Sequence, residues 1–334
     1  MREHAKRRGI THIDEKIVDV DLKENGDIAA LRTENDRSFE ADFFVDCSGF
    51  RSLLLQEALG VPFKSFGENL FNDSAVVMPT PADPNGTNAQ TISTALKYGW
   101  VWDIPLVNRT GNGYVYSSRF CDAAQAETEL RAHLGLLDSD VEARHLKMKV
   151  GRVEEHWRKN CLAVGLSQGF IEPLEATALH LVLVTVETFM AEFEKDNFAP
   201  QSPDKFNALV NARFEGIRDY IVCHYRVNQR SDTPYWIENA KNDKLSDSLQ
   251  RILQCWISNG DLTREVANQD ISKYYSSMSW HCLLAGYGSF PREEKLQPAP
   301  ADVNRFDLAT IKDFVRRCAL NFRDHKEILD EMYG

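Results

Sequence analysis

The residues best suited to chemistry lie in the segment 165–180, which reads GLSQGFIEPLEATALH. Pro173 fits the first turn of a helix, because a proline has no N–H to leave unpaired there. The segment therefore predicts that Glu175, Thr177 and Ala178 lie in the opening turn of an apolar helix. Free backbone N–H groups and the positive end of the helix dipole attract a small anion at such a turn.

The two carboxyl groups of this segment also have a simpler explanation. Glu172 and Glu175 could merely complement the helix dipole, which contributes about 0.3–1 kcal/mol. That explanation serves for Glu172. It serves less well for Glu175, because the helix behind it is apolar on nearly every side. An apolar setting raises the pKa of a carboxyl group, so we expect Glu175 to handle a proton or a hydrogen bond.

Two tryptophans form the second unusual feature. Trp100 and Trp102 stand one residue apart in the run GWVWDIP at 99–105, so both side chains lie on one face of a strand. Together they form a broad, rigid aromatic wall. By itself such a pair is more commonly part of a sheet's core, and the spacing alone leaves both interpretations open.

The first part of the chain is rich in predicted strands. The stretch 13–22 alternates apolar and acidic residues, which predicts a half-buried strand. Asn25 and Gly26 then predict a type I′ hairpin turn, followed by a second strand at 28–33. A third strand at 42–47 is almost continuously apolar and runs into Ser48 and Gly49, as in a sheet whose carboxyl edge faces a ligand.

The next part predicts an antiparallel sheet, and the last part predicts helices. Four alternating segments between residues 68 and 120 are separated by turn residues, and Gly111–Gly113 is expected to be a hairpin turn. The stretch 174–193 is apolar nearly all round, which predicts a largely buried helix. Three amphipathic helices follow, with the stripes Phe206, Leu209, Val210, Phe214, Ile217 and Ile221; Leu249, Ile252, Leu253 and Trp256; and Leu308, Ile311, Val315, Cys318 and Phe322.

Composition narrows the choice of partners. The chain has 334 residues, 43% of them apolar, and a formal net charge of −11. Nucleic acid and anionic membranes both favour basic surfaces, so neither is expected as the main partner. We also expect no membrane-spanning helix, because no apolar run reaches the roughly 20 residues that a span needs.

The cysteines and histidines predict neither disulfides nor a metal site. The seven cysteines are scattered and none forms a C-x-x-C pair, which is typical of buried, inert thiols in a reducing cytoplasm. His180, His224 and His281 lack metal-ligand spacing and are more simply packed in the protein.

Several segments together resemble the flavin-dependent halogenases of the tryptophan-halogenase family. The run at 99–105 resembles the signature W-x-W-x-I-P, with all four fixed positions present as Trp100, Trp102, Ile104 and Pro105. The run GFIEPLEATA at 169–178 resembles G-F-x-E-P-L-E-[SA]-T-G, and DCSGFRS at 46–52 resembles D-x-S-G-F-x-S. The matches appear in family order up to about residue 295.

The resemblance implies a role for each matched residue. Glu175 corresponds to the catalytic glutamate, and Thr177 and Ala178 correspond to the Thr-Gly pair associated with halide binding. The methyl group of Ala178, where the family usually has glycine, is expected to narrow the halide pocket. The positions matched to the flavin site are Ser48, Gly49, Gly165, Gly169, Phe170, Ile171 and Leu179.

The substrate site is less sharply predicted. Tyr274 and Tyr275 resemble the wall of that site. Halogenases of free tryptophan hold the amino acid with tyrosines and an acid just upstream of the wall, whereas the stretch 261–265 offers no tyrosine pair. We therefore expect tryptophan, indole or a derivative as the electron-rich aromatic substrate.

The resemblance also implies the fold class and its division into parts. The expected class is α/β plus α: a partial FAD-binding fold, like that of glutathione reductase and of flavin monooxygenases and halogenases, with an antiparallel substrate sheet and a C-terminal helical subdomain. The expected parts are 1–66, a remnant of the FAD domain; 67–160, the sheet; 161–195, a return to the FAD domain with the active-site helix; and 196–334, the helical substrate-binding subdomain.

The implied reaction uses FADH2, oxygen and chloride or bromide. A flavin hydroperoxide oxidises the halide to hypohalous acid, which the aromatic ring attacks. A separate flavin reductase supplies FADH2 as a transient partner. A cytoplasmic location follows from the composition, a homodimer is compatible with the family, and nucleic acid, membrane and metal are not expected.

Two family features have no match in the chain. A strand–loop–helix unit with G-x-G-x-x-G and a catalytic lysine are both missing, so we expect an N-terminally truncated chain that is inactive alone. A flavin-dependent aromatic monooxygenase and a non-catalytic remnant that binds a small ligand stay open as alternatives. A helical interaction module is a third alternative, supported only by the amphipathic stripes.

Overall fold

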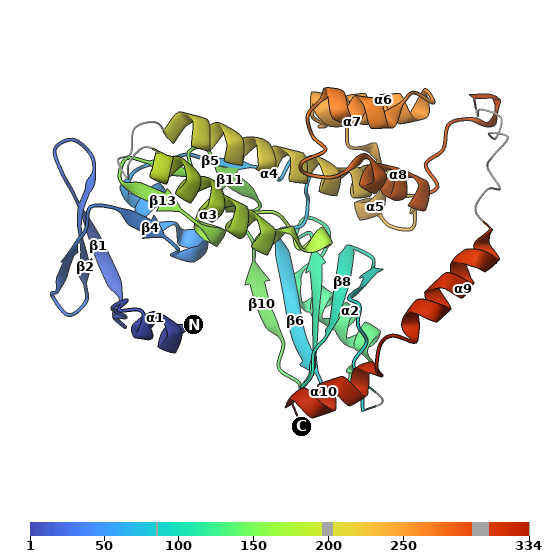
Figure 1. Ribbon diagram of the computed structural model, residues 1–334, viewed down its shortest axis with the longest axis horizontal. Helices are drawn as coiled ribbons and strands as arrows, with labels where there is room; N and C mark the ends of the chain where they lie inside the picture. The colour runs from blue at the N-terminus through green and yellow to red at the C-terminus, as the bar shows by residue number, and fades with distance from the viewer. Residues whose placement is uncertain (85, 196–202, 296–306, 334) are drawn as a thin grey trace. The chain divides into compact units, whose positions relative to one another are not determined.

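The computed structural model describes residues 1–84, 86–195, 203–295 and 307–333 (Figure 1). The chain divides into two compact units. The first unit comprises residues 1–66 and 149–215, and the second comprises 67–148 and 216 onward. The first division falls between Phe66 and Gly67. The return to the first unit runs from Lys149 to Glu215.

The first unit begins with a short helix and an antiparallel sheet. Helix α1 (Arg2–Arg7) precedes three strands in the order β1-β2-β3. Their bounds are β1 Ile17–Leu22, β2 Ile28–Thr33 and β3 Ser38–Glu40. The strands at 17–22 and 28–33 confirm the two predicted strands. The buried face expected for the first strand is not formed, because Val18 and Leu22 are exposed.

The turn between β1 and β2 is not the expected type I′ turn. That type needs two residues with positive φ, and here only Gly26 is left-handed, with a φ of 84°. The side-chain oxygen of Asn25 instead accepts a hydrogen bond from the Asp27 N–H at 3.0 Å. Local side-chain hydrogen bonds of this kind compete with the tighter backbone turn.

Two further three-stranded sheets complete the first unit. One has the order β12-β13-β4, with β4 (Phe44–Asp46) parallel to β13 (Cys161–Ala163) and antiparallel pairing of β13 with β12 (Trp157–Arg158). The other has the order β14-β11-β5, with bounds β14 Gly169–Phe170, β11 Gly151–Val153 and β5 Phe63–Ser65. Pairing between segments so distant in sequence joins the two stretches of the first unit.

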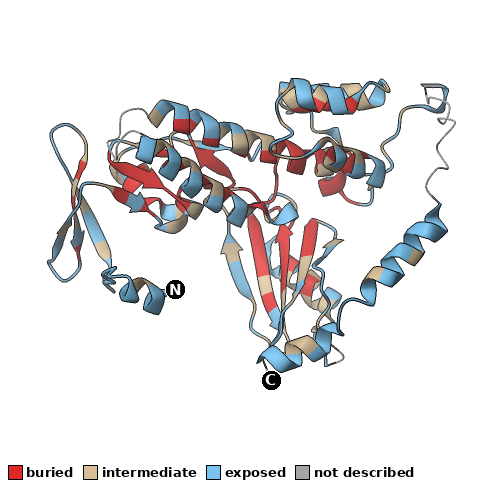
Figure 2. Cartoon of the chain, in the orientation of Figure 1, coloured by how far each residue is buried: buried red, intermediate tan, exposed pale blue. Residues whose placement is uncertain are grey.

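Buried side chains hold these sheets together (Figure 2). One cluster gathers apolar residues from the strands and from the π-helix Leu53–Ala58. A second, aromatic cluster surrounds Trp157, whose ring lies 5.0 Å from Phe189 and 5.8 Å from Phe206, both edge-on. These contacts place the first turns of α4 (Pro203–Arg226) and the last turns of α3 (Thr177–Lys195) against β12.

Helix α3 is much less buried than its composition predicts. Leu179 is 77% exposed and Leu183, Val186 and Met190 are exposed as well, so the described part of the chain leaves these apolar side chains of the helix uncovered. Of the described residues, the stretch Leu174–Lys195 is long and apolar enough to cross a membrane by length and composition, contrary to the sequence expectation. One such helix is weak evidence for a membrane span, because the core helix of a soluble protein meets the same criterion.

The second unit contains a five-stranded antiparallel sheet in the order β10-β6-β9-β8-β7. Its strands are β6 Ser74–Thr80, β7 Ile92–Ala95, β8 Gly99–Pro105, β9 Thr110–Tyr116 and β10 Arg144–Lys147. Helix α2 (Ala123–Leu134) packs on one face of the sheet through Ala126 and Leu130.

The prediction of a hairpin turn at Gly111–Gly113 was wrong. These residues pair within β9. The turn lies between Leu106 and Arg109, where the Leu106 N–H donates a hydrogen bond to the Arg109 carbonyl oxygen.

The helices of the second unit start at polar capping residues. Thr233, Ser246, Asp261 and Ser276 each accept a backbone N–H at the start of a helix, as N-caps do. The helices are α5 Pro234–Lys241, α6 Asp247–Ile257, α7 Leu262–Asn268, α8 Ser277–Gly286, α9 Leu308–Ala319 and α10 His325–Tyr333. The predicted helix at 308–322 is confirmed as α9, but its stripe is not core, because none of its residues is buried.

Candidate active site

A strained turn precedes helix α3. Leu174–Ala176 form a short 3-10 turn in which Glu175 has a φ of 68° and Ala176 a φ of 53°. Left-handed angles cost a non-glycine residue about 1–2 kcal/mol, and such strain gathers at functional sites. The sequence placed Glu175 inside the opening turn of the helix. The structure places it before the helix, which begins at Thr177.

The first residue of α3 carries a buried hydroxyl group. Thr177 is 7% exposed, and its Oγ1 has no hydrogen-bond partner among the residues that the structure describes. Burial of an unpaired polar atom costs about 1–3 kcal/mol of stability. A buried hydroxyl of this kind is therefore expected to have an acceptor when the site is occupied. An anion at the helix N-terminus could supply such an acceptor.

The burial of the two glutamates in this segment is the reverse of what the sequence predicts. Glu172, which the sequence assigned to the helix dipole, is completely buried. Glu175, for which an apolar setting was expected, is exposed.

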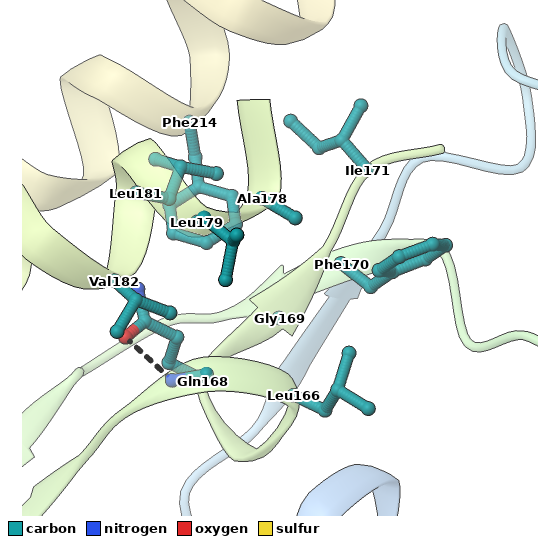
Figure 3. A pocket seen from close by; sticks show the side chains of 11 residues that line it. Leu166, Gln168, Gly169, Phe170, Ile171, Ala178, Leu179, Leu181, Val182 and Phe214 are labelled. Carbon is teal, nitrogen blue, oxygen red and sulfur yellow. Dashed lines mark hydrogen bonds between the residues drawn. The ribbon is translucent and has the colours of Figure 1, made fainter. Parts of the chain in front are cut away.

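An apolar pocket of about 160 Å³ opens beside this turn (Figure 3). Five of the seven predicted flavin positions line it: Gly165, Gly169, Phe170, Ile171 and Leu179. Ala178, predicted to bind halide, lines it too. Sequence reasoning did not assign Leu166, Gln168, Leu181, Val182 or Phe214 to the site, although all of them line the pocket.

Two glycines shape the pocket wall. Gly165 has a φ of 74° and Gly169 a φ of 152°. A Cβ added to Gly169 would lie 2.6 Å from the carbonyl oxygen of Gly151, closer than real Cβ contacts come. Only glycine fits there, so the bare backbone faces the pocket. Apolar walls with exposed glycine backbone fit a flat ring system such as that of a flavin.

The polar side chain of the pocket lining is already engaged. Gln168 Oε1 accepts a hydrogen bond from the Gly165 N–H at 3.2 Å, the dashed line in Figure 3. Its Nε2 donates to Thr185 Oγ1 at 3.0 Å. Gln168 therefore ties the 3-10 turn Gly165–Ser167 to helix α3.

The charged groups behind the pocket are paired. Arg152 Nη2 lies 2.9 Å from Glu215 Oε1, and Lys64 Nζ lies 2.8 Å from the same oxygen. His156 is fully buried close to this group. Burial and then the charge of Arg152 lower the pKa of His156 from 6.5 to about 3, so its ring is neutral.

Ser48 and Gly49 do not line the pocket. Ser48 Oγ donates to the Asp46 carboxylate at 2.6 Å, and that buried carboxylate also accepts the N–H groups of Leu54 and Leu55 at 2.9 Å. Gly49 has a φ of 76°, and a Cβ added to it would meet nothing within 4 Å. Gly49 therefore has open space beside it in the turn after β4.

The tryptophan wall lies in the second unit. Trp100 and Trp102 project from the same face of β8, with ring centroids 6.2 Å apart, and Trp100 is buried. Trp102 packs directly over Gly113, where an added Cβ would lie 2.0 Å from the indole ring. Ile104 and Pro105 end the strand. Gly113, which was wrongly predicted to lie in a turn, thus leaves the space that the second indole occupies.

Tyr274 and Tyr275 are packed against the second half of α4. The ring of Tyr275 stacks on Tyr220 at 3.6 Å, and the ring of Tyr274 occupies the space that a Cβ on Gly216 would need. The space left beside them, next to Trp280, amounts to about 10 Å³. An indole ring does not fit in so small a space, so in this structure the two tyrosines are packed rather than poised around a cavity.

The described residues hold no cluster of His, Cys, Asp and Glu suited to a metal. All seven cysteines are free. Cys121, Cys161 and Cys223 are buried as expected, whereas Cys47 and Cys282 are exposed. Burial and then Asp46 raise the pKa of Cys161 to about 12, which keeps that thiol protonated and inert.

Comparison with known proteins shows the family. Residues 1–301 match the model of the tryptophan halogenase family, and the chain belongs to that family. A 7-chloro-L-tryptophan 6-halogenase of Kutzneria, KtzR, is 36% identical over 99% of this chain. The tryptophan 7-halogenase RebH of Lentzea aerocolonigenes is 32% identical, also over 99% of this chain.

Solved structures agree with the sequence relatives. The tryptophan 6-halogenase SttH of Streptomyces toxytricini superposes with a TM-score of 0.84 and 33% identity, covering 99% of this chain and 65% of that one. The chain also spans 64% of KtzR and 65% of RebH. It therefore corresponds to just under two thirds of the length of these relatives.

Proposed function

We propose that this chain carries the halide and flavin site of an enzyme that halogenates an electron-rich aromatic ring: tryptophan, indole or a derivative. The observation that carries the proposal is the left-handed Glu175–Ala176 turn, which leads into the buried, unpaired hydroxyl of Thr177. Membership of the tryptophan halogenase family supports it. The partial FAD-binding fold expected from the sequence is part of the same proposal.

The apolar pocket is the proposed place of the flavin ring. Gly165, Gly169, Phe170, Ile171 and Leu179 would hold it through backbone and apolar contacts. When bound in its reduced form, supplied by a separate reductase, FAD with oxygen provides the oxidant that turns halide into hypohalous acid. The protein's part is to exclude water from that reaction, which the apolar walls favour.

Thr177 and Ala178 are the proposed halide ligands. Both lie at the N-terminus of a 19-residue helix, where backbone N–H groups lack acceptors and the helix dipole is positive. Ala178 also lines the pocket, so a halide held there would lie beside the flavin ring. Its methyl group leaves less room than the glycine common in the family.

Glu175 is the proposed catalytic carboxylate. Because it is exposed at the turn beside α3, its oxygens are accessible to a substrate or to a proton carrier. In that position it can accept a proton from the ring as halogenation is completed. Trp100 and Trp102 are proposed to be the aromatic wall that accompanies this chemistry, and Tyr274 and Tyr275 to take part in substrate binding after the packing around them opens.

Chloride titration of wild type and of Thr177→Val tests the halide site. Valine keeps the shape of threonine but removes the hydroxyl, so in chloride-free buffer the variant should be about 1 kcal/mol more stable to urea. Chloride or bromide should then stabilise wild type in a saturable way and the variant hardly at all. Equal halide stabilisation of both proteins would contradict the assignment. A flavin monooxygenase, the alternative from the sequence, predicts no saturable halide effect in either.

A further inference from the structure

The proposed halide site lies beside a negative charge. Glu175 is exposed two residues before Thr177, so its carboxylate repels an anion held at the start of helix α3. The whole chain is acidic as well, with a formal net charge of −11. The helix dipole offsets this only with a partial charge, roughly half a unit at the N-terminus. A cationic group close to the first turn of α3 would therefore stabilise a halide there.

Helix α4 runs antiparallel to α3 and brings an arginine to that turn (Figure 1). Near the start of α4, Lys205 Nζ lies 2.8 Å from Glu192 Oε1, close to the C-terminal end of α3. Further along α4, Arg213 Nη1 lies 3.3 Å from His180 Nε2 in the first part of α3. The order of these two contacts places Arg213 at the end of α3 that begins with Thr177.

The position of His180 directs the guanidinium toward the helix start. His180 follows Thr177 by three residues, and side chains at this spacing are neighbours on a helix surface. Helical side chains also lean toward the N-terminus of their helix, so the imidazole covers the turn that precedes its own Cα. The guanidinium in contact with this ring is therefore close enough for its charge to act on an anion at Thr177.

The contact defines the role of each partner. A guanidinium has only donors, so Arg213 donates the hydrogen bond and His180 Nε2 accepts it. The imidazole in this contact is therefore neutral, with its hydrogen on Nδ1, and the positive charge belongs to Arg213. A guanidinium stays protonated at any ordinary pH. Because Arg213 is partly buried, solvent screens its charge less than that of an exposed arginine.

We propose that Arg213 is the cationic group that offsets Glu175 and attracts halide to the start of α3, and that His180 is the positioning residue that holds the guanidinium there. This inference rests on the proposed halide site at Thr177 and Ala178 and adds the charge that makes this site favourable for an anion. The backbone N–H groups and the Thr177 hydroxyl remain the direct ligands, and Arg213 acts through its charge.

Chloride titration of the purified chain, followed by thermal stability, tests the charge of Arg213. Sodium gluconate keeps the ionic strength constant, because added salt alone screens charges. Arg213→Gln should weaken chloride binding roughly three- to tenfold, since a unit charge near the anion is lost. Arg213→Lys keeps the charge and should stay within about twofold of the wild type.

Arg109→Gln is the matched control for net charge. Arg109 is exposed in the turn between β8 and β9, in the second unit, and its replacement changes the total charge by the same amount. It should leave the chloride affinity of the wild type unchanged, because its charge is not part of the proposed site.

Two variants of His180 test its positioning role. His180→Leu removes the acceptor that holds Arg213 and should weaken chloride binding by about twofold, because the guanidinium keeps its charge but loses its place. His180→Gln retains an acceptor oxygen and should restore the affinity. Equal weakening in the two variants would show that the acceptor of His180 does not position Arg213.

Glu175→Gln tests the sign of the electrostatic argument. This variant removes the negative charge that opposes the halide, so chloride should bind more tightly than in the wild type, again by roughly three- to tenfold. Weaker binding in Glu175→Gln would contradict the role of Arg213 as an offset for that carboxylate.

The outcomes separate the inference from the proposed function. Saturable chloride binding that Thr177→Val abolishes and Arg213→Gln leaves unchanged would overturn the role of Arg213 alone. Equal weakening in Arg213→Gln and Arg109→Gln would also overturn it, because the effect would then be one of net charge. Absence of saturable chloride binding in the wild type would instead remove the proposed halide site, and this inference with it.

Discussion

Glu175 and Ala176 adopt backbone angles that residues with a side chain seldom take. Their place immediately before Thr177 links local strain to the helix N-terminus proposed to bind halide. The proposed halide site therefore depends on the backbone conformation of Glu175 and Ala176 as well as on the side chain of Thr177.

Replacement of Ala176 by glycine measures the backbone strain directly. Ala176→Gly should leave the free energy of unfolding unchanged or raise it by up to about 1 kcal/mol, because glycine adopts the left-handed region freely. Ala191→Gly, exposed within helix α3, is the control and should lose about 1 kcal/mol. Urea unfolding of both variants gives the comparison. An equal loss in the two would show that residue 176 is not strained.

His156 predicts a specific dependence of stability on pH. Its pKa is about 3 in the folded chain and about 6.5 when unfolded, so between these values only the unfolded chain binds a proton. Stability therefore falls as the pH falls below 6.5. From pH 7 to pH 5 the loss due to His156 is on the order of 2 kcal/mol.

Urea unfolding of wild type and of His156→Gln at pH 7 and pH 5 isolates that effect. Glutamine does not titrate in this range, so the wild type should lose more stability on acidification than the variant. The same loss in both would mean that His156 is not held neutral.

Among the elements, β9 shows how a glycine can position an aromatic wall. Gly113 lies beneath the ring of Trp102, and Gly111, two residues earlier on the same strand, has only ordinary contacts. Gly113→Ala should cost roughly 1–3 kcal/mol through overpacking and should displace Trp102. Gly111→Ala is the matched control and should change little.

Near-ultraviolet circular dichroism and thermal unfolding would follow both changes. A displaced indole should alter the aromatic signal in the Gly113 variant only. If the two alanine variants behave alike, Trp102 is not seated on Gly113.

The same strand shows where sequence reasoning reaches its limit. Alternation located β6 to β9 within a few residues, because a half-buried strand imposes a period of two on its side chains. The Gly111–Gly113 run was interpreted as a turn because glycine and asparagine favour turns. Its actual reason, the space needed by an indole from the neighbouring strand, depends on a cross-strand register that a local pattern does not contain.

Helices show a related limit. The apolar stripe of α4 is buried at Phe206, Val210 and Phe214, as its spacing predicts. The equally apolar α3 and the stripe of α9 are largely exposed. Spacing reports that a helix has an apolar face, whereas burial depends on what packs against that face. For the same reason Phe214 was assigned to the core, and its place in the pocket lining was not predicted.

At the scale of the whole molecule, the candidate site for halide and flavin lies within the first unit, and the tryptophan wall lies within the second. The family was identified from short motifs, since those strings combine several fixed positions, and the comparisons confirm it. Motif matching also assigned five flavin positions that converge on one pocket. It could not foresee that Ser48 and Gly49 lie outside that pocket or that Tyr274 and Tyr275 are closely packed.

The halide site is the central claim, and diffraction from bromide-soaked crystals tests it most directly. Bromide scatters anomalously, so its position can be located without reference to activity. The account predicts an anomalous peak within hydrogen-bond distance of the Thr177 hydroxyl and the Ala178 N–H, and loss of that peak in Thr177→Val. Bromide peaks found only elsewhere on the protein, at a concentration that saturates its surface sites, would contradict it.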